Sequence, residues 1–344
     1  MMKKKVVLIV FFAAAALLTG CTLPADDSGG SSKISLVTNI VTTEVIKNVY
    51  VSGGYLYAAA GYDGLIVYQI VNPSNLVKKD TYSDNVPVND VVVKTVGGSN
   101  YAFIPLGNVN DTAGMMVLNV TMATNIYLPD ANHLEAAIAN ASGAAIAVKD
   151  DGSEAYVADD FKGLIKYALA IPATGVGAST IKSLNNNPGV DISVSGSIAY
   201  IAGKEGGVFV VDVTGAGTIK ANLSSSLSIV NGTAISGSTL VVADRMNGIL
   251  VYDVSDPAKP KLKSSYDTSG DAFDAVVNGS DIFVANGADG ILWLTIASAS
   301  SLTLKGSYHE TSGICYKLFY STDTTPYIYA AYGPAGIKIF KTGN

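Results

Sequence analysis

The stretch VVADRMNGILVYDV, residues 241–254, decides the fold. It joins a β-branched run to a second run of β-branched and aromatic residues through a polar turn that ends in glycine. Runs of this length, bounded by turn residues, are typical of β-strands. The turn needs a residue that tolerates positive φ, which Gly248 supplies. The stretch therefore predicts a tight antiparallel hairpin.

The same pattern recurs seven times along the chain. An aromatic or β-branched residue is followed two positions later by alanine or proline, and then by glycine. The copies are Tyr57/Ala59/Gly64, Phe103/Pro105/Gly114, Tyr156/Ala158/Gly163, Tyr200/Ala202/Gly207, Val241/Ala243/Gly248, Phe283/Ala285/Gly290 and Tyr329/Ala331/Gly336. Successive glycines are 50, 49, 44, 41, 42 and 46 residues apart. A period in this narrow range indicates a repeat architecture.

Each copy offers four short strands. One precedes the motif, two flank its glycine, and a more polar one follows. The expected first strands are 45–51, 90–96, 191–194, 229–235 and 272–277, and the expected fourth strands are 76–82, 261–266 and 302–308. Four antiparallel strands in 41 to 50 residues is the size of one propeller blade. We expect an all-β, seven-bladed β-propeller over residues 34–344, without a long helix and with the alanines packed between blades.

The two ends of the chain predict how the ring closes. The seventh copy stops after its third strand, residues 337–340, and the sequence ends at Asn344. Residues 34–41 precede the first copy and have no repeat of their own. If they supply the missing fourth strand of the last blade, no sheet edge stays open between the first and last blades. An open solenoid would need capping units instead.

The first residues have the features of an export signal. Three lysines at positions 3–5 precede an apolar run over residues 6–18. This run is too short to span a bilayer but suits a signal peptide. Leu18-Thr19-Gly20-Cys21 then resembles the lipobox of bacterial lipoproteins.

That resemblance implies a signal peptide over residues 1–20 and a lipidated Cys21. In lipoproteins the cysteine receives a diacylglycerol thioether and, after cleavage, an acyl chain such as palmitate on its new amino terminus. Thr22 stands where an aspartate would favour retention in the inner membrane, so the resemblance points to the outer membrane or cell surface. Residues 21–33 are predicted to be a lipid-anchored flexible linker, since they are rich in Gly, Ser and Asp. The alternative is an ordinary secretory peptide with a chance cysteine.

Composition narrows the possible partners. A net charge of −6 argues against nucleic-acid binding, which needs basic surface. Cys21 and Cys315 are the only cysteines, so no disulfide framework is expected.

Two segments, GILVYDVSDP (248–257) and GVFVVDV (207–213), resemble the LVIVD repeat of bacterial surface and secreted proteins. The resemblance spans roughly residues 45–344 and is clearest in copies one, four and five. Copies two, three and six depart from the terminal Asp-Val, with Asn119-Val, Ala168-Leu and Thr295-Ile. The family implies a propeller and supplies no catalytic motif.

Few residues suggest catalysis. His133 and His309 have no partner at metal-ligand spacing, which is typical of loop histidines. Cys315 lies between Ile314 and Tyr316, which favours a packed strand thiol over a nucleophile. No nucleophile elbow, zinc-protease helix or phosphate-binding loop is present. We therefore expect no enzymatic activity and no resident cofactor.

One face of the expected ring is a candidate binding surface. The turns between second and third strands emerge beside the connections between blades. The turns carry Asp63, Asp159, Asp160, Glu205, Asp244, Arg245 and Asp289, and the connections add Asp84, Asn85, Asp267, Asp271, His309 and Glu310. Such an acidic rim would suit a cation, a basic peptide or a sugar. Asp and Asn are also common in turns because their side chains bond the local backbone, and that reading stays open.

The long turn of the second copy, GNVNDTAG (107–114), is a separate metal candidate. Asn108, Asn110 and Asp111 offer oxygen ligands for Ca²⁺. The turn lacks EF-hand spacing and a bidentate glutamate. The sequence as a whole favours a lipid-anchored, non-enzymatic binding module for a protein or polysaccharide partner. A scaffold in an outer-membrane assembly is the alternative, and a hydrolase or lyase working in the channel is a third reading.

Overall fold

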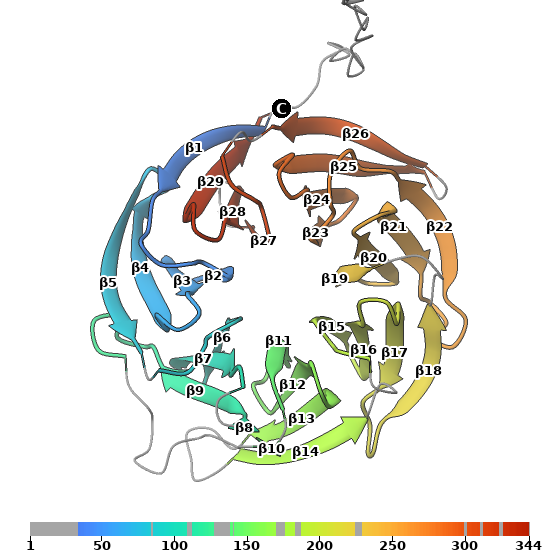
Figure 1. Cartoon of the computed structure of the whole chain (residues 1–344), viewed down its shortest axis with the longest axis horizontal. Coiled ribbons are helices and arrows are strands. Elements are labelled where there is room, and N and C mark those ends of the chain that lie inside the picture. The colour runs from blue at the N-terminus through green and yellow to red at the C-terminus, as the bar shows by residue number, and fades with distance from the viewer. Residues whose placement is uncertain are drawn as a thin grey trace, which may run out of the picture. The chain divides into compact units, whose positions relative to one another are not determined.

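A computed structural model describes residues 34–83, 85–108, 112–126, 138–139, 141–169, 176–182, 187–223, 229–298, 301–309, 312–322 and 326–343. Over these ranges the protein is an all-β, seven-bladed β-propeller, as the sequence predicts (Figure 1). No helix long and apolar enough to cross a membrane occurs in the part of the chain that the structure describes.

Each blade is an antiparallel sheet whose first strand is innermost (Figure 1). The first blade contains β2 (Asn48–Ser52), β3 (Tyr55–Ala59), β4 (Leu65–Asn72) and β5 (Asn75–Tyr82). The second contains β6 (Val92–Val96), β7 (Ser99–Pro105) and β9 (Met115–Asn119), and the third contains β11 (Gly143–Val148), β12 (Glu154–Asp159), β13 (Gly163–Leu169) and β14 (Val176–Lys182). The fourth contains β15 (Asp191–Ser195), β16 (Ile198–Ala202), β17 (Val208–Asp212) and β18 (Thr218–Leu223).

The remaining blades follow the same order. The fifth contains β19 (Val230–Ser236), β20 (Thr239–Asp244), β21 (Gly248–Asp253) and β22 (Lys261–Tyr266). The sixth contains β23 (Asp274–Asn278), β24 (Asp281–Ala285), β25 (Ile291–Ser298) and β26 (Ser301–Tyr308). The seventh contains β27 (Lys317–Ser321), β28 (Tyr327–Ala331), β29 (Ile337–Thr342) and β1 (Ile34–Ile40). A two-residue ribbon pairs β8 (Thr112–Ala113) with β10 (Ile138–Ala139) beside the second blade.

The expected strands are present, with ends shifted by a few residues. The largest shift is in the first blade, where β2 begins at Asn48 instead of residue 45. Ile46 lies outside the sheet because its backbone bonds to Gly333 of the last blade, with N–O distances of 3.0 and 3.1 Å. The chain enters the first blade only after this bridge.

Two physical constraints require glycine at this position of the repeat. Six of its seven copies have φ between 73° and 87°, which the hairpin turn requires. The position is also crowded. A Cβ on Gly64 would overlap the carbonyl oxygen of Tyr82, at the end of the fourth strand, and one on Gly248 would overlap that of Tyr266. Alanine is therefore excluded by sterics as well as by backbone conformation.

The hydrophobic core lies between blades. Seven buried clusters occur in the described residues, and each joins two neighbouring blades. The repeat alanines are all fully buried, which confirms their predicted position between close-packed blades. One cluster joins the first blade to the last, with Leu56 and Ile66 packed against Tyr329 and Ile339.

The chain's first described strand closes the ring. β1 pairs antiparallel with β29, from Ile34 opposite Thr342 to Ile40 opposite Ile337. A Cβ on Gly336 would overlap the carbonyl oxygen of Ile40, so β1 takes the same place beside its repeat glycine as β5 and β22 take beside theirs. The predicted closure is confirmed.

Two faces of the ring follow from the strand directions. We call "turn face" the side with the turns between first and second strands and between third and fourth strands. We call "loop face" the side with the turns between second and third strands and the connections between blades. β1 runs from the turn face at Ile34 to the loop face at Ile40, because its partner β29 starts at the loop face.

Removing β1 should destabilise the ring. A chain that begins at Thr42 leaves the edge of β29 unpaired. It also leaves empty the pocket that Ile34 fills, where this side chain is only 5% exposed. We expect a loss of at least about 2 kcal/mol in the free energy of unfolding, the value of one buried isoleucine, and concentration-dependent aggregation. Urea titration measures the first and light scattering the second. The control is a chain that begins at Ile34, and equal stability of the two chains would contradict closure by β1.

Candidate functional site: the loop face

Backbone bridges hold the loop face together. Gly61, in the turn of the first blade, exchanges two hydrogen bonds with Val88 in the next connection, both with N–O distances of 2.9 Å. The same kind of bridge joins other turns to their neighbouring connections. These bridges are Ile46 with Gly333, Lys204 with Val230, and Gly287 with Cys315. A rigid frame that carries variable loops is a common basis for binding sites.

The predicted rim residues that the structure describes lie on this face, but with different exposure. Asp63, Glu205 and Arg245 are exposed, while Asp160 and Asp289 are half-buried. Arg245 donates from Nε and Nη2 to Asp271 Oδ2, at 2.9 and 2.8 Å. Several of these charges are therefore engaged with each other.

Two other ion pairs on the rim have longer N–O distances. Lys204 Nζ lies 4.0 Å from Asp160 Oδ1, and His309 Nδ1 lies 3.9 Å from Asp289 Oδ1. Burial raises the pKa of Asp160 despite the opposing effect of Lys204. Among the described residues, no ion pair involves Asp63, Glu205 or Asp267. The loop face therefore presents carboxylates that are open to a partner.

Two predicted rim residues build turns instead of facing solvent. Asp159 is fully buried, and its carboxylate accepts hydrogen bonds from the backbone N–H groups of Ser142, Phe161 and Lys162. Asp244 is 1% exposed and accepts from Asn247 Nδ2 at 3.1 Å. For these two positions the structure supports the turn-building reading that the sequence left open.

The sequence reading missed a set of exposed apolar side chains on the same face. Five large apolar side chains among the described residues are more than 60% exposed, and four of them lie on the loop face. These four are Val41 (78%), Tyr62 (68%), Phe161 (63%) and Met246 (69%). They come from four different loops, and exposed aromatic and Met side chains are enriched at interaction sites.

Three of these side chains share one position in the repeat. Tyr62, Phe161 and Met246 each stand two residues before the repeat glycine, in blades one, three and five. We call them the apolar tips. Their signal was available in the sequence, since an aromatic or Met is unusual at the tip of a polar turn. The pattern of charged residues does not reveal it.

A second polar cluster lies at the centre of the ring, and the sequence analysis did not predict it. Asp191 and Asp274 begin the first strands of blades four and six, and Asp90 lies two residues before the first strand of blade two. All three are nearly buried. Each carboxylate accepts a hydrogen bond from the backbone of the next blade. The donors are the N–H groups of Ile146 (2.9 Å), Thr233 (2.7 Å) and Leu318 (2.9 Å).

Lys317 joins this cluster from the seventh blade. Its Nζ lies 2.5 Å from Asp191 Oδ1 and 3.4 Å from Asp274 Oδ1, so it links blade seven to blades four and six. Burial lowers the pKa of Lys317, but the carboxylates of Asp191 and Asp274 outweigh this effect and raise it overall. Burial raises the pKa of Asp274 to about 6 against the effect of Lys317, and it raises the pKa of Asp90 as well.

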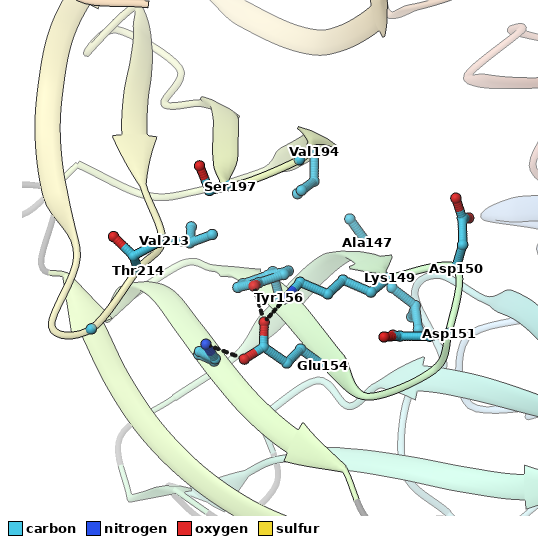
Figure 2. Close-up of a pocket in the computed structure, with 14 residues that line it drawn as sticks. Ala147, Lys149, Asp150, Asp151, Glu154, Tyr156, Val194, Ser197, Val213 and Thr214 are labelled. Atoms are coloured by element: carbon cyan, nitrogen blue, oxygen red, sulfur yellow. Dashed lines mark hydrogen bonds and ion pairs between the residues drawn. The ribbon is translucent and has the colours of Figure 1, made fainter.

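The turn face has a groove of about 730 Å³ between blades three and four. It exists because the turn from β11 to β12 has five residues, 149–153, where its neighbours have two. Figure 2 shows Lys149, Glu154 and Tyr156 together on one wall and Val194, Val213 and Thr214 on the other.

Glu154 organises the polar wall of this groove. Its carboxylate contacts the ammonium groups of Lys149 and Lys166 and accepts the Tyr156 hydroxyl at 2.5 Å. Burial raises the pKa of Glu154, but the three hydrogen bonds outweigh it and lower the pKa to about 2. The groove volume is within the range of small-ligand sites. The charged groups on this wall, Glu154 with Lys149 and Lys166, are already paired with each other.

The other predicted candidates stay predictions. Asn108 is described, and its Nδ2 donates to the carbonyl of Ala141 at 2.8 Å, while Asn110 and Asp111 lie outside the described residues. No group of three His, Cys, Asp or Glu with metal-site geometry occurs within the described ranges. Cys315 is fully buried, as expected of a packed thiol. Cys21, Asp84, His133 and Glu310 fall outside the described residues.

Comparisons with known proteins agree with this geometry. The LVIVD repeat model, of a family known to form β-propellers, matches residues 46–84, 189–227 and 229–268, which are blades one, four and five. A comparison with curated protein sequences returned no match. The fold resembles the crystal structure of Saccharomyces cerevisiae Sqt1, with TM-score 0.65, 8% identity, and 90% of this chain and 99% of that chain covered. It also resembles the computationally designed Ika8 protein, with TM-score 0.59, 10% identity, and 91% and 100% covered. At such identities these two likenesses show the fold alone.

Replacing Lys317 should destabilise the whole ring. Lys317→Met leaves the carboxylates of Asp191 and Asp274 enclosed without their cation, and removing one partner of a buried pair costs about 3 to 5 kcal/mol. Urea unfolding measures the change. Lys220→Met is the matched control, because Lys220 pairs with Asp212 at the surface and exposed pairs contribute little. Equal stability of the two variants would show that the central cluster does not hold the blades together.

Asp274 should give stability a distinct pH dependence. Its pKa is about 6 in the folded protein and near 3.8 in an unfolded chain, so the folded state binds the extra proton between these values. The contribution of Asp274 to the free energy of unfolding therefore decreases as the pH rises from about 4 to about 6. Asp274→Asn should remove this slope, because an amide oxygen still accepts the Leu318 N–H but does not titrate. Urea titrations over that pH range compare the two proteins, and parallel profiles would contradict the assignment.

Proposed function

We propose that this chain is a lipid-anchored, non-enzymatic binding module of the bacterial cell envelope. Its loop face would hold a protein or polysaccharide partner. One observation carries the proposal: four of the five most exposed large apolar side chains in the described residues lie on that face, among carboxylates. Exposed apolar groups on a rigid frame lose little entropy when a partner buries them. Such residues often supply most of the binding energy of an interface.

The charges of the loop face favour a partner with basic groups around an apolar centre. Asp63, Glu205 and Asp267 can each receive a cation, and the apolar tips can enter pockets between such cations. Complementary charge of this kind directs a partner to the correct orientation more than it adds affinity. A basic protein surface fits both features, and an amino sugar fits the carboxylates and can stack on the rings of Tyr62 and Phe161.

The lipid anchor is part of the same proposal. It rests on the positively charged leader, the apolar run and the lipobox that ends at Cys21. Lipid on this cysteine would hold the module at the outer membrane or cell surface, since several acyl chains make a stable anchor.

A role as a scaffold in an outer-membrane assembly is the second candidate. It is favoured by the groove between blades three and four, because a scaffold needs contacts on more than one face. Under this proposal the turn-face groove receives a second component while the loop face receives the first.

Site-specific crosslinking in intact cells tests these proposals. A photo-crosslinking residue at Phe161 reports on the loop face, one at Ser197 on the groove, and one at Ser280 on an exposed turn elsewhere on the turn face. A binding module should give a defined adduct at position 161 and none at 197 or 280. Adducts at both 161 and 197 would favour the scaffold.

The apolar tips provide the matched variant. Tyr62→Ser combined with Met246→Ser should reduce the adduct at position 161 about tenfold, since truncating an interface anchor costs roughly 1 to 2 kcal/mol. The melting temperature should not change, because both side chains are largely exposed. An adduct that persists at full yield in this variant would remove the apolar tips from the binding site.

A further inference from the structure

The chain enters the propeller on the turn face. Ile34 is the first described residue, and it pairs with Thr342 at the end of β29 that lies farthest from the loop-face turn at Gly336. Ile34 is 5% exposed and packs in a cluster with Phe283 and Phe340. The point of attachment for everything that precedes the domain is therefore fixed on one side of the ring.

The segment between the proposed anchor and this point is short. Residues 22–33 separate Cys21 from Ile34. Fully extended, these steps span at most about 45 Å. A Gly- and Ser-rich chain of this length has a typical end-to-end distance of about 20 Å. The side of the ring on which the chain enters should thus lie near the lipid.

We infer that the turn face is the side of the propeller that faces the lipid surface and that the loop face points away from it. This inference rests on the lipid anchor of the proposed function. It assigns the two faces different neighbours: anionic and zwitterionic headgroups on one side, and the binding partner on the other.

The charges of the two faces agree with this orientation. Four lysines toward the turn face are paired with carboxylates. The pairs are Lys94 with Asp150, Lys220 with Asp212, Lys263 with Asp253, and Lys305 with Asp281. An anionic leaflet would attract or repel such pairs only weakly. It would attract Lys259 and Lys261 near the turn from β21 to β22, which are exposed and in no ion pair among the described residues. It would repel the open carboxylates of Asp63, Glu205 and Asp267 on the loop face.

Several turns on the turn face are short and carry small side chains. On the turn face, two-residue turns of Gly and Ser recur, and they place few bulky groups between the ring and the headgroups. These turns include residues 53–54, 97–98, 237–238 and 279–280. The apolar tips lie on the opposite side, where they are open to a partner. The competing arrangement, in which the apolar tips insert into the lipid, would have to bring the open carboxylates to the headgroups as well.

The test measures how close each face lies to the lipid in the full lipidated chain. The protein is reconstituted in vesicles of phosphatidylethanolamine with a minor fraction of phosphatidylglycerol and a headgroup-linked nitroxide. Single fluorophores are attached at Ser280→Cys or Ala288→Cys, which are exposed at opposite ends of the strand β24. A second matched pair, Ser197→Cys and Glu205→Cys, sits at opposite ends of β16 in blade four. Cys315 is fully buried, and the unsubstituted chain controls for any label there.

The turn-face labels at 280 and 197 should be quenched at least about twofold more than the labels at 288 and 205, since the two ends of a five-residue strand lie about 17 Å apart. Equal quenching within each pair, or stronger quenching at 288 and 205, would overturn the inference. The latter result would indicate insertion of the loop face.

The anchor is read separately in the same samples. Intact mass should show the acyl groups on Cys21, and the chain should float with the vesicles. A chain without acyl groups that does not float would contradict the anchor in the proposed function and remove the basis of the inference. An acylated, floating chain with equal quenching within each pair would contradict the orientation alone.

Discussion

The pairing of β1 with β29 is the constraint on which the rest of the structure depends. Seven sheets can pack face to face around a centre only if the last also packs against the first, and that interface is completed by the strand that begins the domain. Because the core lies between blades, each blade depends on both neighbours. β1 completes the last blade, and its Val37 and Ile40 add to the interface that Leu56 and Ile66 of the first blade form with Tyr329 and Ile339.

Most of the fold could be predicted from the sequence because its signals are local. The repeat glycine, the alanine on the other side of the turn and the apolar runs all lie within about twenty residues. Each has a steric reason in the structure, which is positive φ at Gly64 and complete burial at Ala59. Closure was predictable too, since a blade without a fourth strand and a strand without a blade both show in the sequence.

The candidate site was predictable only in part. The sequence placed Asp159 and Asp244 on the correct face, but whether a turn carboxylate points to solvent or to backbone N–H groups depends on geometry that the residue type does not reveal. The cluster of Asp90, Asp191, Asp274 and Lys317 joins blades that are distant in the chain. Asp191, Asp274 and Lys317 share one repeat position, opposite the repeat alanine of their blade, but the sequence does not show that these side chains meet at the centre. The apolar tips could have been found by comparing one turn position across all copies.

The central cluster also bears on what the ring can admit. Lys317 of blade seven reaches a carboxylate of blade four. The inner strands of these two blades lie on opposite sides of the ring's centre (Figure 1), so the ion pair bridges the axis. A solute moving along the axis would meet that ammonium and the carboxylates of Asp191 and Asp274, which hold fixed charges of both signs on its path. The inside of the ring thus presents ion-paired groups, in contrast to the exposed apolar side chains of the loop face.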